Sequence, residues 1–293
     1  MNLKQLLAMG CFAIAPYTSW AQGIIVHMTD GTEVRYKASE VESITTFGGS
    51  VDTEETKDMV FKVGDVEFKM IYVEGGSFMM GATPEQGDNI GYDELPIHDV
   101  QLSSFYIGET EVTQGLWESV MGVNLSSGIH DPNKPVQNIT WTQCNEFIDA
   151  LSNETGMQFS LPTEAQWEYA ARGGSKSKGY KFAGGNKIED IAWYFSNSND
   201  TVHAVATKLP NELQLYDMTG NVWEWCYDYY DGDYYSSSSS INPQGPKTGN
   251  RRVYRGGGFR HNANNSRLSL RNHNEESFSY SDIGLRLVLL SKE

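Results

Sequence analysis

Cysteine is scarce in this sequence, with 3 residues among 293. A small scaffold stapled by disulfides is therefore excluded, because such scaffolds need several pairs of cysteines. Basic residues are also few: 22 Lys and Arg stand against 38 Asp and Glu, and the formal net charge is −16. Nucleic-acid phosphates and anionic lipid headgroups repel such a chain, so we expect no nucleic-acid partner.

Long apolar runs are missing too. Leu6–Ala15 is apolar throughout but is shorter than the roughly 20 residues that cross a bilayer, and no later stretch comes close, so we expect no membrane span. Lys4 precedes this run, and Ser19 and Ala21 put small residues at a cleavage point. The pattern is typical of a secretory signal peptide over residues 1–21. It predicts export to the periplasm, the cell surface or the medium.

Two questions about the cysteines stay open at this level. Cys11 follows Ala8-Met9-Gly10, a context compatible with lipid attachment, so the sequence allows either a lipoprotein or a freely released protein. Cys144 and Cys226 could pair in an oxidising compartment, and two separate buried thiols are the alternative. The spacing decides neither question, because a bridge depends on the separation of the Cα atoms.

A small β-rich unit follows the predicted signal peptide at residues 22–47. Asp30-Gly31 is a hairpin signal. Three short runs have strand character: Ile24–Met28, Val34–Lys37 and Val41–Phe47. About 25 residues bury too little apolar surface to be stable alone, so we expect the unit to dock or assemble. Residues 48–58 are small and acidic, a composition typical of a linker.

The main domain is expected to span residues 59–293. It is rich in glycine, with 29 residues in the chain, and in aromatic side chains, at 12%, which indicates a loop-rich fold pinned by large side chains. Thr140 and Thr163 each stand three residues before a glutamine, which is the capping-box spacing of a helix start. The predicted elements are a strand over Phe68–Val73 and helices over Thr113–Met121, from Thr140 to about Asn153 with a stop at Gly156, and from Thr163 to Gly173.

Several motifs occur in a fixed order along the main domain. They are Val73–Gly81, Glu94–His98, Glu109–Thr113, Pro135–Trp141, Leu161–Gly174, Leu215–Trp225, Arg255–Phe259 and Ile283–Arg286. Together they resemble the sulfatase-modifying-factor family, typified by formylglycine-generating enzyme, over about residues 66–290. The resemblance implies an α+β fold, a loop-rich variant of the C-type lectin fold, to which the small N-terminal β unit is added.

The catalytic metal site of this family has no counterpart in the sequence. The family's enzymes oxidise a substrate cysteine with copper(I) held by two cysteines after an RGGSW-like motif, and soft thiolates suit copper(I). Here the matching motif is Arg255–Phe259, in which Gly258 replaces the family's active-site serine, and Cys226 is the last cysteine of the chain. We therefore expect no copper and no catalytic residues, which favours a protein that is not an enzyme.

The segment Leu215–Trp225 resembles a calcium-binding loop of the family. Carried over by position, Asp217 and Glu224 would supply carboxylates, and Gly220 and Val222 would supply backbone carbonyls. Calcium prefers oxygen ligands, so calcium is the expected cofactor. The alternative is structural, with the tryptophans of this segment anchoring the core and the carboxylates capping loops.

An asparagine-rich segment, residues 260–281, follows the Arg255–Phe259 motif. Asparagine mixed with Arg, His and aromatic side chains offers adaptable hydrogen bonds together with rigid contacts. The resemblance implies that this segment lies on the face that holds substrate peptide in the enzymes. The predicted ligand-binding residues are Arg260, His261, Asn262, Asn264, Asn265, Asn272, His273, Asn274, Phe278 and Tyr280. The alternative is that these polar residues only satisfy turns.

These observations favour an exported, non-catalytic member of the family that binds an extracellular or surface protein, or a glycan, through its C-terminal face. Two alternatives stay open. One is a formylglycine-generating oxidase that acts on a protein cysteine with metal ligands outside the family pattern. The other is a structural subunit of a surface or secretion assembly.

Overall fold

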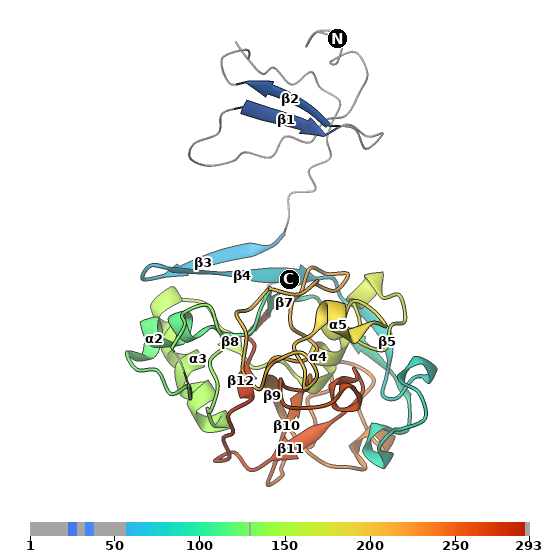
Figure 1. Ribbon diagram of the computed structural model, residues 1–293. Coiled ribbons are helices and arrows are strands. Elements are labelled where there is room, and N and C mark those ends of the chain that lie inside the picture. The colour runs from blue at the N-terminus through green and yellow to red at the C-terminus, as the bar shows by residue number, and fades with distance from the viewer. Residues whose placement is uncertain (1–22, 28–32, 38–56, 129, 291–293) are drawn as a thin grey trace. The chain divides into compact units, whose positions relative to one another are not determined.

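The chain divides into two compact units, residues 1–55 and residues 56–293. The computed structural model describes residues 23–27, 33–37, 57–128 and 130–290 (Figure 1). No helix in this part of the chain is long and apolar enough to cross a membrane.

In the first unit, two strands form an antiparallel pair, β1 (Gly23–His27) and β2 (Glu33–Lys37). Gly23 lies opposite Lys37. The first two strand-like runs that the sequence predicts are confirmed, and each begins one residue earlier than expected. The third predicted run, the hairpin turn, the predicted signal peptide and most of the predicted linker lie outside the described residues.

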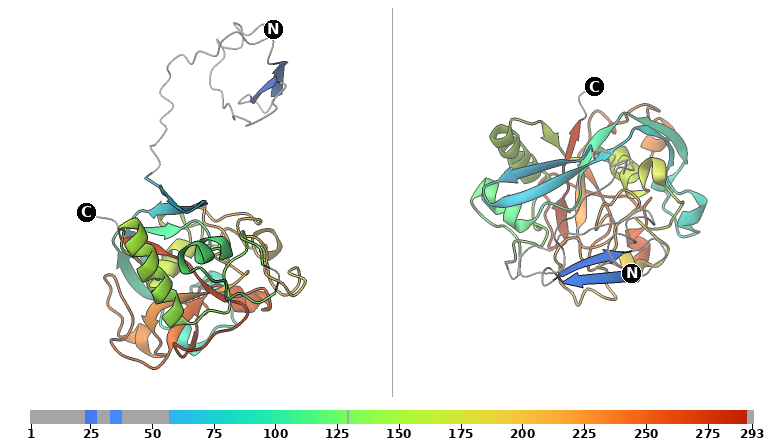
Figure 2. Two further views of the ribbon diagram at one scale, coloured as in Figure 1. Left: turned by 90° about the vertical axis from the view of Figure 1, so that its left-hand side faces the viewer. Right: turned by 90° about the horizontal axis from the view of Figure 1, so that it is seen from above.

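The second unit is built on a five-stranded antiparallel sheet. Its strands, in spatial order, are β3 (Met59–Val63), β4 (Val66–Val73), β7 (Phe105–Gly108), β13 (Val288–Leu290) and β8 (Phe159–Ser160). The ribbon formed by β3 and β4 lies across one face of the unit (Figure 2). The last described strand of the chain enters the middle of this sheet, because β13 pairs with both β7 and β8.

A second sheet has four strands, and a third has two. The order in the second sheet is β11 (Asn272–Asn274), β10 (Arg252–Arg255), β9 (Trp223–Tyr229) and β12 (Ile283–Leu285). β12 runs parallel to β9, whereas the other pairs are antiparallel. The third sheet consists of β5 (Gly76–Met80) and β6 (His98–Leu102).

Short helices connect the strands. The α-helices are α2 (Gln114–Met121), α3 (Trp141–Thr155), α4 (Glu164–Ala171) and α5 (Ile188–Ile191). The 3-10 helices are η2 (Pro84–Gln86), η3 (Tyr92–Glu94), η4 (Gly174–Lys176), η5 (Tyr234–Ser236) and η6 (Ala263–Ser266). The capping boxes predicted at Thr140 and Thr163 are present. α3 runs two residues beyond its predicted end and stops at Gly156, which has a φ of 71°.

The five-stranded sheet is covered on both faces. Side chains alternate between the faces of a strand, so neighbours enter different hydrophobic clusters. Ile71 packs in the cluster that contains α4, and Met70 packs in the cluster that contains α2 and α3. Buried tryptophans anchor both clusters, as the aromatic content predicts: Trp117, Trp167, Trp223 and Trp225.

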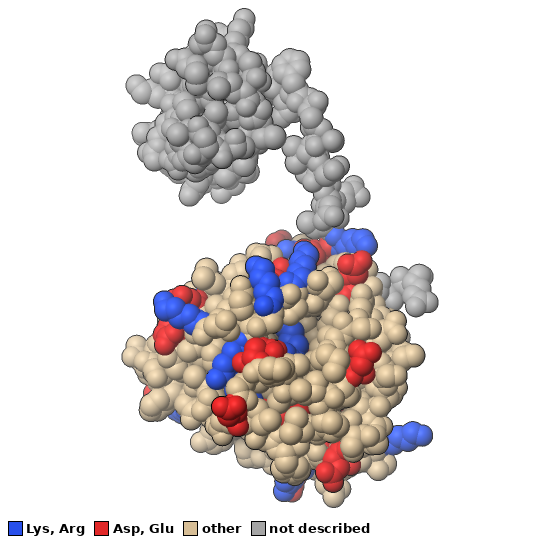
Figure 3. Space-filling model, turned by 90° about the vertical axis from the view of Figure 1, so that its right-hand side faces the viewer, with Lys and Arg blue, Asp and Glu red and all other residues tan. Residues whose placement is uncertain are grey.

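The surface of the second unit carries charges of both signs. On the face shown in Figure 3, Lys and Arg side chains lie near Asp and Glu side chains, and uncharged residues cover most of the area.

Candidate functional site

Several of the sequence motifs converge at the start of β9. β12 lies parallel to β9 and brings Gly284 opposite Glu224. Arg255, the last residue of β10, lies opposite Glu224 on the other side. The residues that follow β10 and those that precede β12 are therefore neighbours, although they are distant in the sequence.

His261 and Asp282 are paired at this place, with 3.0 Å between His261 Nε2 and Asp282 Oδ2. The Asp282 side chain is 1% exposed and that of His261 is 34% exposed, so a buried carboxylate lies within ion-pair distance of a histidine that reaches solvent. The His261 ring packs edge-on against Trp223, with centroids 5.3 Å apart. A Cβ at Gly258 would lie 2.9 Å from Asp282 Oδ2. The glycine therefore leaves room for this carboxylate where the family carries a serine.

Arg260 joins the two ends of the asparagine-rich segment at the surface. Its Nε donates to Asp200 Oδ1 at 2.6 Å, and its Nη1 donates to Ser281 Oγ at 2.5 Å. Both side chains of the Arg260–Asp200 pair reach solvent. The guanidinium also lies 4.9 Å from the centre of the Phe259 ring, so its position is fixed from three directions.

Two exposed aromatic residues are tied to the neighbours of this arginine. Phe195 is 69% exposed, and its backbone nitrogen donates to the carbonyl of His261, the residue after Arg260, at 3.0 Å. Tyr280 is 51% exposed and directly precedes Ser281, whose hydroxyl accepts from Arg260. We name these residues the Arg260 surface: Phe195, Asp200, Arg260, His261 and Tyr280. The sequence had not singled out Phe195 or Asp200, because no local pattern marks either of them.

The asparagines that follow Arg260 hold a local turn. The Asn262 side chain caps η6, since its oxygen accepts hydrogen bonds from the backbone nitrogens of Asn264 at 3.0 Å and Asn265 at 3.3 Å. Ala263 packs against the hydrophobic cluster around α5. Asn262 thus has the turn role that the sequence allowed as the alternative, whereas the Asn264 side chain stays exposed.

Three of the other predicted ligand residues lie apart from the Arg260 surface. Residues Asn272–Asn274 form β11, which is three strands away from β12, or about 14 Å at the usual strand spacing. His273 stacks on Tyr230 with ring centroids 3.6 Å apart, and burial together with Arg251 lowers its pKa. Phe278 packs against the cluster of α2 and α3, and its ring also stacks on that of Tyr280 with centroids 6.3 Å apart, so it adjoins the Arg260 surface. The ten predicted residues therefore do not form one site.

The predicted calcium carboxylates are both buried and have protein partners. Glu224 Oε1 accepts from Arg286 Nη2 at 2.7 Å, and Glu224 Oε2 accepts from Trp167 Nε1 at 2.7 Å. Asp217 Oδ2 accepts from the backbone nitrogen of Ala206 at 2.7 Å. Asp217 Oδ1 is buried and has no hydrogen-bond partner in the described part of the chain.

The predicted backbone ligands lie in the tight loop between these carboxylates. Gly220 has a φ of 84°, and a Cβ there would lie 2.3 Å from the Trp193 carbonyl oxygen, so glycine is required. The backbone nitrogen of Val222 donates to Glu111 Oε1 at 3.0 Å. Glu111 is thus a third buried carboxylate beside this loop, and it belongs to a motif from which the sequence predicted no site residue.

Arg286 supplies the positive charge at this cluster. Burial raises the pKa of Asp217 to about 6, and the Glu224 carboxylate adds to the rise. Burial and the carboxylates of Asp217 and Glu224 also raise the pKa of Glu111 well above its ordinary value, whereas Arg286 lowers it. Burial thus favours the protonated forms of Asp217 and Glu111, and Arg286 is the guanidinium that opposes this rise in pKa.

The donor set does not fit a calcium ion in this arrangement. Calcium takes six to eight oxygen ligands, and both Glu224 oxygens are already bound to Arg286 and Trp167. In residues 57–128 and 130–290, no three or more His, Cys, Asp or Glu side chains form a group that could hold a metal ion. Asp217 Oδ1 is the open oxygen in favour of calcium, which stays a prediction.

Cys144 and Cys226 are free and buried. Cys144 lies in α3 and packs in the cluster of α2 and α3, whereas Cys226 lies in β9 and packs in the cluster of α4. Burial raises the pKa of both thiols well above its ordinary value. The disulfide that the sequence left open is therefore absent, and neither thiol is poised as a nucleophile.

Comparison with known proteins places this architecture in a family. The model of the sulfatase-modifying factor enzyme 1-like domain matches residues 61–290. The chain belongs to this family, and its fold is the loop-rich, mixed α/β fold of formylglycine-generating-enzyme-like proteins. Both the family and the fold that the sequence motifs predict are confirmed.

Individual relatives differ in what they are named for. Chaperone protein LppX of Paenibacillus barcinonensis is 29% identical and aligns with 75% of this chain and 88% of its own. Formylglycine-generating enzyme of Streptomyces coelicolor is 28% identical, over 72% of this chain and 86% of its own. The solved structure of Treponema denticola variable protein 1 superposes with a TM-score of 0.72 at 31% identity, covering 80% of this chain and 99% of that one. Other curated relatives are longer, and this chain spans less than two thirds of their length.

Proposed function

We propose that this chain is an exported, non-catalytic member of the family that binds a protein or glycan ligand through the Arg260 surface. The observation that carries the proposal is the state of the thiols. The segment after β10 contains His261 and no cysteine, and Cys144 and Cys226 are buried with raised pKa values. A buried, protonated thiol is a poor copper ligand and a poor nucleophile.

The Arg260 surface has the chemistry of a recognition site. Phe195 and Tyr280 are mostly exposed, and burying such rings against a partner contributes more binding energy than most side chains do. Arg260 is held by Asp200 and Ser281, so little conformational freedom is lost when it contacts a ligand.

Two of the relatives support binding rather than catalysis. One is named a chaperone, which implies contact with another protein, and it aligns along 88% of its length. The structural neighbour is named a variable protein. A protein ligand is therefore the first class to test, with glycans second.

The oxidase alternative is tested directly. The purified chain is supplied with copper(I), dioxygen and a cysteine-containing sulfatase peptide, and aldehyde formation is followed by mass spectrometry. We expect no product, whereas the Streptomyces coelicolor enzyme in the same assay serves as the positive control. Aldehyde formed by this chain in stoichiometric excess would overturn the non-catalytic assignment.

Binding is tested by screening the chain against secreted and surface proteins and against an array of glycans. A hit supports the proposal only when the double variant Phe195→Ala with Tyr280→Ala binds at least about tenfold more weakly, as expected for paired hot-spot residues. Tyr92→Ala is the matched control, because Tyr92 is a 73% exposed aromatic residue outside the Arg260 surface. Equal losses in both variants would contradict the assignment of the site.

Export is the remaining part of the proposal. Sequencing the N-terminus of the protein from its native cells is expected to give a chain that starts at Gln22, outside the cytoplasm. An N-terminus at Met1 in the cytoplasmic fraction would refute export, and lipid attached at Cys11 would replace free release by anchoring.

A further inference from the structure

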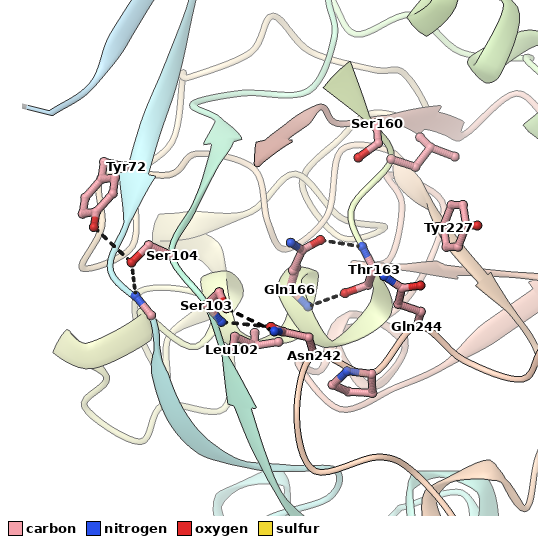
Figure 4. A pocket seen from close by; sticks show the side chains of 13 residues that line it. Tyr72, Leu102, Ser103, Ser104, Ser160, Thr163, Gln166, Tyr227, Asn242 and Gln244 are labelled. Atoms are coloured by element: carbon pink, nitrogen blue, oxygen red, sulfur yellow. Dashed lines mark hydrogen bonds between the residues drawn. The ribbon is translucent and has the colours of Figure 1, made fainter. Parts of the chain in front are cut away.

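A cleft of about 750 Å³ lies near the far end of β9 from the Arg260 surface. Figure 4 shows five parts of the chain around it: the end of β4, the β6–β7 turn, the approach to α4, β9, and the loop at residues 242–244. Trp223 contacts His261 at the start of β9, and Tyr227 lines the cleft four residues later. Four residues of a strand span about 13 Å, so the cleft is separate from the Arg260 surface.

The lining of this cleft is uncharged and mixes polar with apolar groups. None of its 13 residues is Asp, Glu, Lys, Arg or His, although the chain as a whole has a net charge of −16. Hydroxyl or amide side chains come from these positions: Tyr72, Ser103, Ser104, Ser160, Thr163, Gln166, Tyr227, Asn242 and Gln244. An ion entering the cleft would meet no lining residue of opposite charge, which disfavours a charged ligand. Two cations lie beside lining tyrosines without lining the cleft themselves: Lys57 Nζ is 4.5 Å from the centre of the Tyr72 ring, and the Arg252 guanidinium is 5.8 Å from that of Tyr227.

Hydrogen bonds between lining residues fix the walls. Asn242 Oδ1 accepts from the backbone nitrogen of Ser103 at 2.9 Å, and Asn242 Nδ2 donates to Ser103 Oγ at 3.1 Å (Figure 4). Ser104 Oγ accepts from the Tyr72 hydroxyl at 3.0 Å and from the backbone nitrogen of Gly75 at 3.0 Å. The turn and the loop are therefore held in place before any ligand arrives.

Three other side chains offer polar groups to a ligand. Ser160, Tyr227 and Gln244 carry no hydrogen bond among the residues drawn in Figure 4. Tyr227 is 44% exposed, so one part of its ring and its hydroxyl are accessible. A hydroxyl and a primary amide can each donate and accept, and a tyrosine ring adds an apolar face.

We infer that this cleft binds a short neutral oligosaccharide. Sugar hydroxyls both donate and accept hydrogen bonds, as do the side chains of Ser160, Gln244 and Tyr227, and the apolar face of a pyranose ring packs on an aromatic ring. The volume lies within the range of about 300–1,000 Å³ that is usual for small-ligand sites. The assignment does not depend on the ligand of the Arg260 surface.

The test uses the full chain and five defined probes. All probes carry a fluorescent label. The neutral probes are maltotetraose, cellotetraose, xylotetraose and chitotetraose that is N-acetylated on every residue. The charged probe is tetragalacturonate. We expect at least one neutral probe to bind with a Kd of about 1 mM or tighter, and tetragalacturonate to bind at least about tenfold more weakly. Anisotropy gives the affinities, and the unlabelled sugar must compete.

Variants assign the binding to the cleft. Tyr227→Ala is expected to lower the affinity for the probe at least about tenfold, and Gln244→Ala about fivefold. Tyr280→Ala, an exposed tyrosine of the Arg260 surface, is the matched control and should leave the affinity unchanged. Both cleft residues are exposed, so their variants should fold, and thermal unfolding checks this.

Three results would overturn the inference. The first is that none of the four neutral probes binds. The second is that Tyr227→Ala and Tyr280→Ala bind equally well, which would move the sugar away from the cleft. The third is that an extended peptide binds there with loss on Tyr227→Ala while no sugar competes with it, which would make the cleft a peptide site. A failure of the sugar test leaves the Arg260 surface proposal intact, because that proposal is tested with other ligands and with variants of Phe195 and Tyr280, which do not line the cleft.

Discussion

The arginines of the second unit fall into two groups that differ in burial. Arg255 and Arg286 are 0% exposed and pair with Glu164 at 2.6 Å and with Glu224 at 2.7 Å. Arg260 follows soon after Arg255 in the sequence, yet its side chain is 39% exposed and its partner, Asp200, is 75% exposed. The same ion-pair chemistry therefore serves the interior in one case and the surface in the other.

The buried group is a network rather than a set of isolated pairs. Arg255 contacts both Glu164 and Glu168 at 2.6 Å, and Arg271 contacts Glu164 at 2.7 Å. Burial opposes ionisation of Glu164, but Arg271 and Arg255 outweigh it and lower the pKa of this carboxyl. Residues of the family motifs thus hold the fold, whereas the exposed residues next to them belong to the surface for which we propose a binding role.

Removing a buried arginine should give the largest effect. Arg255→Met leaves Glu164 and Glu168 buried with less compensation, so we expect a loss of about 3–5 kcal/mol in the free energy of unfolding. Urea unfolding measures it. Arg260→Met, the same replacement at an exposed site, should lose less than about 1 kcal/mol.

Similar losses in the two arginine variants would contradict the division into buried and exposed groups. If Arg255→Met does not fold, Arg255→Lys provides the measurement. Lysine keeps the charge but cannot reach both carboxylates with the same geometry. The free energy of unfolding of Arg255→Lys should therefore lie between that of the wild type and that of Arg255→Met.

The buried network also predicts an unusual pH dependence through Asp228. Burial and the neighbouring Glu164 raise the pKa of Asp228 from 3.8 to about 8. The folded protein therefore takes up a proton at this group, and its contribution to stability falls as the pH rises from about 4 to about 8. Asp228→Asn cannot ionise, so relative to the wild type it should gain on the order of 3–4 kcal/mol between pH 5 and pH 8.

Equilibrium unfolding at several pH values tests this difference. Carboxyls whose pKa values are lowered, such as Glu164, contribute equally to the pH dependence of the wild type and of the variant. Their contribution therefore cancels when the two proteins are compared. Asp99→Asn is the control, because Asp99 is exposed. Parallel stability curves for wild type and Asp228→Asn would show that Asp228 is ionised in the folded protein.

The other buried arginine, Arg286, bears on calcium. Because Glu224 is bound to Arg286 and Trp167, we expect removal of calcium with a chelator to change the Tm by less than about 1 °C, an effect well below 1 kcal/mol for a domain of this size. Differential scanning calorimetry with and without added calcium measures it. A fall of the Tm on chelation that Glu224→Gln abolishes would establish the calcium site predicted from the sequence.

The parts of the fold that were predictable from the sequence depend on neighbours along the chain. Thr140 Oγ accepts from the Gln143 nitrogen at 3.1 Å, as the spacing of the two residues predicts. Gly156 ends the same helix in a left-handed conformation, which glycine adopts without steric cost. The overall fold was predictable as well, because eight motifs of the family occur in a fixed order along the chain.

The candidate site was harder to predict because it depends on contacts between distant residues. Asp200 and Arg260 are 60 positions apart, and nothing in the sequence near Asp200 marks it as a partner. Asn272–Asn274 looked like part of the same ligand-binding face, but pairing of β11 with β10 carries these residues to the opposite edge of the sheet from β12. The orphan Oδ1 of Asp217 likewise depends on which side chains fold around it.

Breaking the exposed Arg260–Asp200 pair should give the smallest effect on stability, and it tests most directly whether Arg260 serves binding or the fold. Asp200→Asn should change the free energy of unfolding by less than about 0.5 kcal/mol, because solvent and salt screen an exposed pair. The same substitution should nevertheless lower the affinity for ligands of the Arg260 surface severalfold. The reason is that Arg260 loses the carboxylate at 2.6 Å that fixes its orientation. Unfolding and binding measured on the same sample separate the two quantities. A variant that lost stability and kept its affinity would show that Arg260, like Arg255, serves the fold, and the distinction between the two groups of arginines would disappear.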